Sequence, residues 1–166
     1  MRKSHAMMLI LGAGLAASAN SATTTATFNV TETVLATCSA TATALAFAPY
    51  TPGGGATANS STISVKCTKN TPSTISLNKG ATTGGTVAQR LMAFGANTLQ
   101  YNLYTTAAVN VIFGDGSGTG QTETGTGAGV ATANTVTVFG QVPDSAANQA
   151  AAPGNYTDTI TVTVTY

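Results

Sequence analysis

The chain has little charge, little sulfur and no tryptophan. Charged residues make up 7% of its 166 residues, and the chain contains one histidine and two cysteines. So few charges provide neither a basic patch for nucleic acid nor a polybasic face for anionic lipid. They also remove much of the repulsion that keeps protein surfaces apart, which favours dense self-packing.

The single histidine lies in a segment typical of a secretory signal peptide. Two basic residues and the histidine precede an apolar run, residues 6–17, that is too short to span a bilayer. Small residues allow cleavage after Ala19 or after Ala22, and the threonine tract that follows Ala22 favours the second site. We therefore expect residues 1–22 to be removed on export, and we expect no membrane-spanning segment elsewhere.

Export would leave a chain without the groups that most enzymes need. Four basic residues and five acidic ones remain in a mature chain of about 144 residues, so its net charge is −1. A serine or cysteine nucleophile has no histidine base, and the scattered acids form no pair for sugar hydrolysis. The sequence therefore predicts no catalytic residues, no metal site and no cofactor.

A glycine-rich run at residues 114–120 is the one segment that suggests a ligand loop. A phosphate loop needs a following helix and usually a lysine, and neither is present. A calcium loop needs several carboxylates, and the run contains only Asp115. We interpret it as a flexible connection between strands.

Alternation of apolar and polar residues predicts an all-β fold. Glycine-rich and proline-rich turns separate the alternating segments, which are residues 26–34, 44–47, 61–67, 74–77, 99–105, 109–113, 135–142 and 156–166. Residues 87–94 fit either a helical turn or a strand. About seven to nine such strands predict an immunoglobulin-like β-sandwich, with a closed barrel as the alternative. The missing tryptophan argues against an antibody-type domain.

Two cysteines in an exported chain predict a disulfide. Cys38 and Cys67 are its only cysteines, and secretion places them in an oxidising space. Closing the loop between them would stabilise the folded state by roughly 3 to 4 kcal/mol. Ile63, Val65 and Cys67 share one face of their predicted strand, so we expect the bond to lie inside.

The first and last predicted strands are the most regular. One face of the first carries Ala26, Phe28, Val30 and Val34. In the last strand, threonines face one side and Asp158 alone interrupts the apolar side, which carries Tyr156, Ile160, Val162, Val164 and Tyr166. Ending on an apolar strand suggests either insertion between existing neighbours or an incomplete sheet that awaits a partner.

Seven short motifs occur in a family's order over nearly the whole mature chain. They are residues 37–38, 45–47, 63–67, 99–104, 113–116, 139–142 and 154–166. With them the chain resembles the spore coat protein U domain family, which includes major subunits of archaic chaperone-usher pili. The most specific motif is the glycine-x-tyrosine-x-aspartate opening of the terminal strand, combined with the two cysteines. Phe113 stands where many relatives carry tryptophan, and it keeps the apolar bulk.

The resemblance implies an immunoglobulin-like pilin fold that lacks its last strand. In such pilins a periplasmic chaperone lends a strand, and the N-terminal segment of the next subunit later replaces it. It implies that residues 23–36 are the donor segment, through Ala26, Phe28, Val30 and Val34, and that residues 37–166 are the pilin domain. The acceptor groove and chaperone-binding strand would then contain Tyr156, Ile160, Val162, Val164 and Tyr166.

The function expected from this reasoning is a structural pilus subunit. It would pass through the periplasm, meet a chaperone and an outer-membrane usher, and polymerise with copies of itself at the cell surface for attachment and biofilm formation. One alternative is a secreted single-domain adhesin or matrix-binding module. Another is a self-contained sandwich whose own N-terminal strand fills the gap.

Overall fold

The computed structural model describes residues 20–166, so the signal peptide predicted at residues 1–22 lies outside the described residues except for its end. The chain divides into two units, Met1–Thr33 and Val34–Tyr166. In the described part of the first unit every residue is exposed and none belongs to a helix or strand. The strand predicted at residues 26–34 is therefore not formed in the isolated chain, because a strand exists only by pairing its backbone with another.

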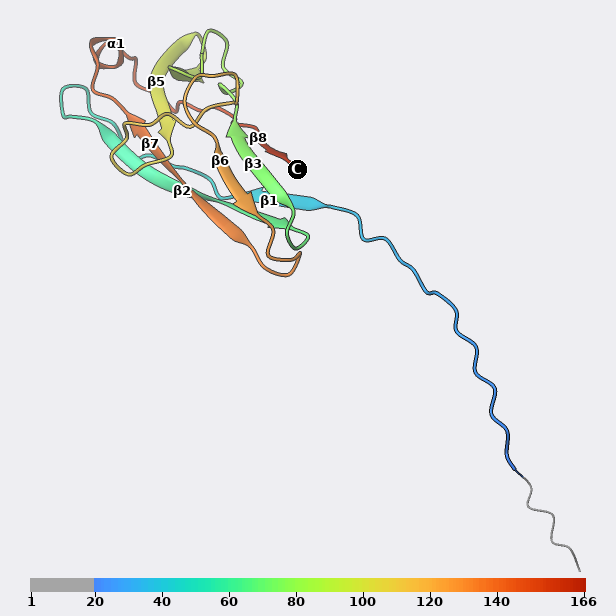
Figure 1. Cartoon of the computed structure of the whole chain (residues 1–166). Coiled ribbons are helices and arrows are strands. Elements are labelled where there is room, and N and C mark those ends of the chain that lie inside the picture. The colour runs from blue at the N-terminus through green and yellow to red at the C-terminus, as the bar shows by residue number, and fades with distance from the viewer. Residues whose placement is uncertain (1–19) are drawn as a thin grey trace, which may run out of the picture. The chain divides into compact units, whose positions relative to one another are not determined.

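The second unit contains eight strands and one short helix (Figure 1). They are β1 (Cys38–Ala42), β2 (Thr57–Cys67), β3 (Pro72–Leu77), β4 (Arg90–Phe94), β5 (Asn97–Tyr104), β6 (Glu123–Thr126), β7 (Asn134–Val142), α1 (Ala146–Gln149) and β8 (Val162–Thr165). One sheet has the order β1-β2-β7-β5-β4 and the other β6-β3-β8, with antiparallel pairing throughout. The predicted all-β, immunoglobulin-like sandwich is confirmed.

The core lies between the sheets and follows the alternation of the strands. Inward positions of both sheets join in one cluster, which contains Ile63, Val65, Cys67, Ile75, Leu77, Leu99, Tyr101, Leu103, Phe113, Val138 and Val142. Burying each large apolar side chain contributes about 1.5 to 3 kcal/mol to folding. Phe113 is completely buried, so the phenylalanine fills the core position that the sequence assigned to it.

The predicted disulfide is confirmed. Cys38 and Cys67 lie directly opposite each other in the β1–β2 ladder, and their sulfur atoms are bonded. Cys67 is buried within the core cluster and Cys38 packs against it. The bond therefore ties the first residue of β1 to the last residue of β2.

Two strands predicted within the second unit are also wrong. Residues 44–47 form no strand, and a side chain of β2 binds their backbone: Asn59 Nδ2 donates to Ala46 O at 2.6 Å. Just before this segment, Ser61 Oγ of the same strand donates to Thr43 O. Residues 109–113 make only isolated bridges, at Ile112 and Phe113. Here a turn around Val109, at φ 48°, takes the place of extended backbone.

The other elements refine the sequence prediction. The undecided segment at residues 87–94 contains the strand β4, and β1, β6 and α1 have no counterpart among the predicted elements. The glycine-rich run at residues 114–120 connects the Phe113 bridge to β6. Its two ends lie close together, since Gly114 N donates to Gln121 O at 2.7 Å and Gln121 N donates to Ile112 O at 2.8 Å.

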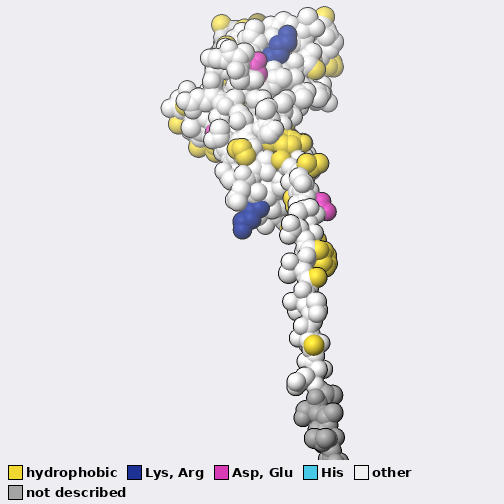
Figure 2. All heavy atoms as spheres, turned by 45° about the vertical axis from the view of Figure 1, so that its right-hand side comes forward, with side chains coloured by type: hydrophobic (Ala, Val, Ile, Leu, Met, Phe, Trp, Pro, Cys, Tyr) yellow, Lys and Arg dark blue, Asp and Glu magenta, His cyan; other side chains and the backbone are white. Residues whose placement is uncertain are grey.

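The surface carries few charges. Figure 2 shows isolated basic and acidic side chains on a mostly uncharged face of the second unit. Among residues 20–166, no helix has the length and apolar character needed to cross a bilayer.

Candidate strand-binding groove

An apolar groove of about 900 Å³ opens on the second unit between two chain segments. Residues 42–52 line one side, here called the first rim, and residues 151–160 line the other, the second rim. The floor is made of core side chains from both sheets, which are Ile63, Leu77, Leu99, Tyr101, Leu103, Val138 and Val142. An apolar groove bordered by an unpaired strand edge suits an extended segment with alternating apolar side chains.

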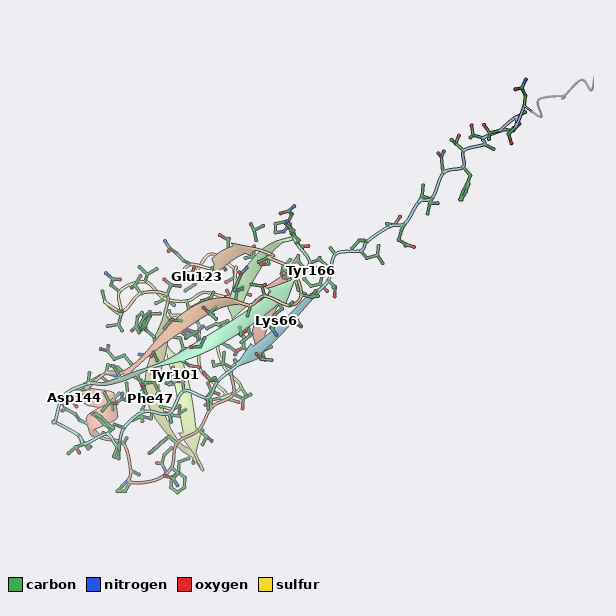
Figure 3. All side chains as sticks on the ribbon, turned by 90° about the horizontal axis from the view of Figure 1, so that it is seen from below. Phe47, Lys66, Tyr101, Glu123, Asp144 and Tyr166 are labelled. Carbon is green, nitrogen blue, oxygen red and sulfur yellow. A yellow bond between two sulfur atoms is a disulfide. The ribbon has the colours of Figure 1, made fainter. Side chains whose placement is uncertain are left out.

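The first rim rests on β7 at a glycine. Leu45 and Phe47 are half-buried, and a Cβ atom at Gly140 would lie 2.8 Å from Leu45 Cδ1 and 2.9 Å from Phe47 Cζ. The Phe47 ring also meets the Tyr101 ring edge-on, with 6.3 Å between the centroids. In Figure 3 both residues lie toward the same end of the sandwich as Asp144. A side chain at position 140 would therefore push the first rim away from the sheet.

Asp144 fixes the end of the first rim. Its carboxylate accepts hydrogen bonds from the Tyr50 hydroxyl at 2.5 Å and from the amides of Gly53 and Gly55, each at 3.0 Å. Gly53 and Gly55 have φ values of +77° and +97°, which glycine adopts without strain. The hydrogen bonds, led by that of Tyr50, lower the pKa of Asp144, while burial and the same contact raise the pKa of Tyr50 to about 12.

Three of the five residues predicted for the acceptor groove line it, and two of these lie on the second rim. Tyr156, Ile160 and Val162 line the groove, half-buried, with exposed threonines between them. Val164 packs against the core outside the groove. Tyr166 is 58% exposed and borders a separate shallow depression. The predicted alternation is thus present, but the groove covers only its first part.

The terminal segment forms a shorter strand than its alternating sequence predicts. Only Val162–Thr165 form a strand, β8, which pairs with β3 on one side and has no other strand neighbour among the described residues. Before β8 the chain makes one isolated bridge, Ala93 to Thr157, and hydrogen bonds to the turn at residues 78–82. The second edge of β8 is therefore open to a further strand.

Asp158 holds the second rim through both carboxylate oxygens. Oδ1 accepts from the amides of Ala81 and Thr82 at 2.9 and 3.0 Å and from Thr82 Oγ1 at 3.0 Å, and Oδ2 accepts from the Tyr101 hydroxyl at 2.6 Å. A Cβ atom at Gly80 would overlap this carboxylate. Burial, and then the bond to Asp158, raise the pKa of Tyr101. The predicted polar interruption of the strand is a structural anchor.

A buried arginine was missed at the sequence level. Arg90 is fully buried, and its guanidinium donates to five oxygens: the carbonyls of Leu77, Asn78, Val87 and Phe113 and the side-chain Oδ1 of Asn102. It thereby holds the end of β3 and the start of the turn at residues 78–82, to which Asp158 binds. No sequence signal separated it from an exposed arginine, because its acceptors come from several separate segments that only the fold brings together.

The residues predicted for the donor segment are exposed. Phe28, Val30 and Val34 are 86%, 83% and 83% exposed, Ala26 is exposed, and none of the four is among the residues that line the groove. These side chains are exposed because the segment makes no helix or strand of its own.

The described residues offer no assembled metal site. They contain no group of three or more histidine, cysteine, aspartate or glutamate side chains placed to bind an ion. Asp115 in the glycine-rich run accepts from the amide and the hydroxyl of Ser117 at 2.9 and 2.6 Å, which makes it part of a local turn.

Comparison with known proteins gives one family and one informative structure. The sequence profile of the Spore Coat Protein U domain matches residues 24–163. The fold is similar to a chain in the crystal structure of the CsuC-CsuE chaperone-tip adhesion subunit pre-assembly complex from archaic chaperone-usher Csu pili of Acinetobacter baumannii, with a TM-score of 0.58 and 24% sequence identity. The match covers 81% of the present chain and 41% of that chain. No curated protein sequence matches.

Proposed function

Because the chain belongs to the Spore Coat Protein U domain family, we propose that it is a structural, non-catalytic subunit of a chaperone-usher pilus. The similar chain is named as part of a chaperone and pilus-subunit complex, which supports a periplasmic chaperone as a partner. An outer-membrane usher and export to the cell surface follow from the same proposal, as do roles in attachment and biofilm formation.

The proposal rests on two features of one chain, an apolar groove and an exposed segment with apolar side chains. The groove has an apolar floor and lies beside the open edge of β8. The exposed segment presents Phe28, Val30 and Val34. Residues 23–36 of one copy would enter the groove of the next as a donor strand, after a chaperone strand has left it.

The energies suit a stable link. Burying the three large apolar side chains of the segment contributes about 1.5 to 3 kcal/mol each. Each new main-chain hydrogen bond adds roughly 0.5 to 1.5 kcal/mol. Ordering the segment offsets part of this sum. Because the donor and acceptor surfaces differ, each added copy exposes a new groove, and the assembly grows as a filament.

Deleting residues 23–36 tests the donor role. The deleted chain should still be recovered as a one-to-one complex with its chaperone, since the groove remains, but it should form no fibres by electron microscopy. A matched control replaces Thr25, Thr27 and Thr31, on the opposite face of the segment, by serine and should assemble normally. Normal fibres from the deleted chain would refute the donor role.

The same micrographs separate a shaft subunit from a tip adhesin. Labelling along the whole fibre by an antibody against this chain supports a shaft subunit. Labelling only at fibre ends supports the adhesin, the role named for the similar complex.

A further inference from the structure

We infer that Glu32 selects the alignment in which the candidate donor segment of one copy binds the groove of another, through its repulsion by Asp158. The inference rests on the proposed function and names a residue that gives this binding its specificity. It concerns the choice among alignments that bring the same apolar face of the segment to the groove.

Glu32 lies on the apolar face of the candidate donor segment. Alternate residues of an extended chain share a face, so Glu32 points the same way as Val30 and Val34. It is the only charged residue among residues 23–36. Its side chain is exposed, and one carboxylate oxygen accepts from the amide of Thr33 at 3.0 Å. A strand that turns its apolar face to a groove therefore also turns a carboxylate toward it.

The groove provides no cation for this carboxylate. No lysine or arginine is among the residues that line it. Arg90 is fully buried, and its guanidinium already donates to five oxygens. Lys79, on the turn at residues 78–82, is exposed and does not line the groove. A carboxylate placed over the apolar floor would lose water without gaining an ion pair, which is unfavourable.

The charged side chain that lines the groove has the same sign as Glu32. Asp158 is half-buried on the second rim. Its carboxylate accepts from the amides of Ala81 and Thr82 and from the hydroxyls of Thr82 and Tyr101. All four donors are neutral groups, so none of them cancels its charge. Asp158 therefore repels a second carboxylate that lies opposite it.

Alternation alone leaves the alignment of the segment open. Side chains of a strand alternate with a period of two, so a strand that slides by two residues still presents its apolar face. Facing side chains of neighbouring strands lie about 4.5 to 5.5 Å apart at Cβ, where like charges destabilise the pair. The alignment with Glu32 opposite Asp158 is therefore disfavoured, and so are alignments that hold Glu32 over the floor.

The favourable alignment leaves Glu32 at an exposed end of the groove. Residues 153–155, at the start of the second rim, are exposed and border the groove. All ladders between the described strands are antiparallel, and we take the same pairing for the donor strand. Glu32 then faces Gly154, where its carboxylate stays in water, and Phe28 faces Asp158.

The test maps where the segment lies in the groove. A peptide of residues 23–36 carries the photo-crosslinking residue p-benzoylphenylalanine in place of Phe28, and mass spectrometry identifies the residue of the full mature chain to which it attaches. We expect the wild-type peptide to attach around Asp158. Sliding by four residues would place residue 32 opposite Asp158 and residue 28 opposite Val162. With E32Q, the share attached around Val162 should rise about fivefold, a ratio typical of one charged pair across a ladder.

Two further peptides separate the position of the charge from its presence. E32K, which Asp158 attracts, should attach mainly around Val162. E32T/T33E keeps the net charge of the peptide but moves the carboxylate to the opposite face, so it should attach as E32Q does.

The outcomes separate this inference from the proposed function. If the wild-type peptide does not bind, the donor role itself is wrong. If it binds and all four peptides attach at the same place, Glu32 does not select the alignment and the donor role stands. If E32K slides no further than E32Q, the repulsion by Asp158 is wrong.

Discussion

Asp144 makes one end of the first rim sensitive to pH. The Tyr50 hydroxyl and the Gly53 and Gly55 amides lower the pKa of Asp144 from its ordinary 3.8. A carboxyl group whose folded pKa is lowered stabilises the folded state above its unfolded pKa, and this stabilisation is lost as the pH falls through the folded pKa. The contact is therefore complete at neutral pH and fails only in acid.

Hydrogen exchange of single amides measures this response. Because the pKa of Asp144 is lowered, we expect the protection of the Gly53 and Gly55 amides to persist as the pH falls to the ordinary value of 3.8 and to be lost only at more acid pH. In D144A, which removes both acceptor oxygens, both amides should be weakly protected even at neutral pH. Gly54 is the internal control, because its amide donates to Thr51 O at 2.9 Å and not to Asp144. Equal protection of Gly53 and Gly55 in D144A and in the wild-type chain at neutral pH would contradict the assignment.

The hydrogen-bonding roles of Asp144 and Asp158 could not be predicted from the sequence. Asp158 was recognisable as the polar interruption of an apolar face, but its acceptor role needs Gly80 and Tyr101, which are distant in sequence. Asp144 lay in a predicted loop and had no signal of its own. Arg90 likewise depends on acceptors contributed by several separate segments.

At the scale of elements, alternation predicted the strands that have a partner on the same chain. β2, β3, β5 and β7 lie where the period of two placed them. The predictions failed at residues 26–34 and 44–47, where the pattern is present but no neighbouring strand pairs with it, and at residues 109–113. Alternation of apolar and polar residues indicates which side chains share an apolar face. A strand also needs a neighbouring backbone with which to form hydrogen bonds, and the alternation does not indicate this.

Ile160 on the second rim lines the groove and should be covered by a bound donor strand. Ile160→Asp places a carboxylate inside the groove, and burying it beneath a donor strand is unfavourable. We expect peptide 23–36 to bind at least about tenfold more weakly, by fluorescence anisotropy. Thr161→Asp is the control, because Thr161 is exposed on the opposite face of the same segment. Equal binding by the two variants would show that the peptide does not cover Ile160.

In the whole molecule, the disulfide lies between the candidate donor segment, residues 23–36, and the rest of the chain, which carries the groove. Cys38, two residues after the candidate donor segment, forms the disulfide with Cys67 in the core of the second unit. The segment can therefore leave or join a groove without unthreading its own core. The low charge of the chain allows copies to pack closely, as a filament requires.

The central claim is that Phe28 of one copy becomes buried in the groove of another. The chain contains no tryptophan, so Phe28→Trp introduces a single reporter at a position that is 86% exposed in the isolated chain. We predict that its fluorescence emission shifts to shorter wavelength as sedimentable polymer forms, with a rate that rises with protein concentration. An emission spectrum that stays typical of exposed tryptophan in the polymer would contradict the account.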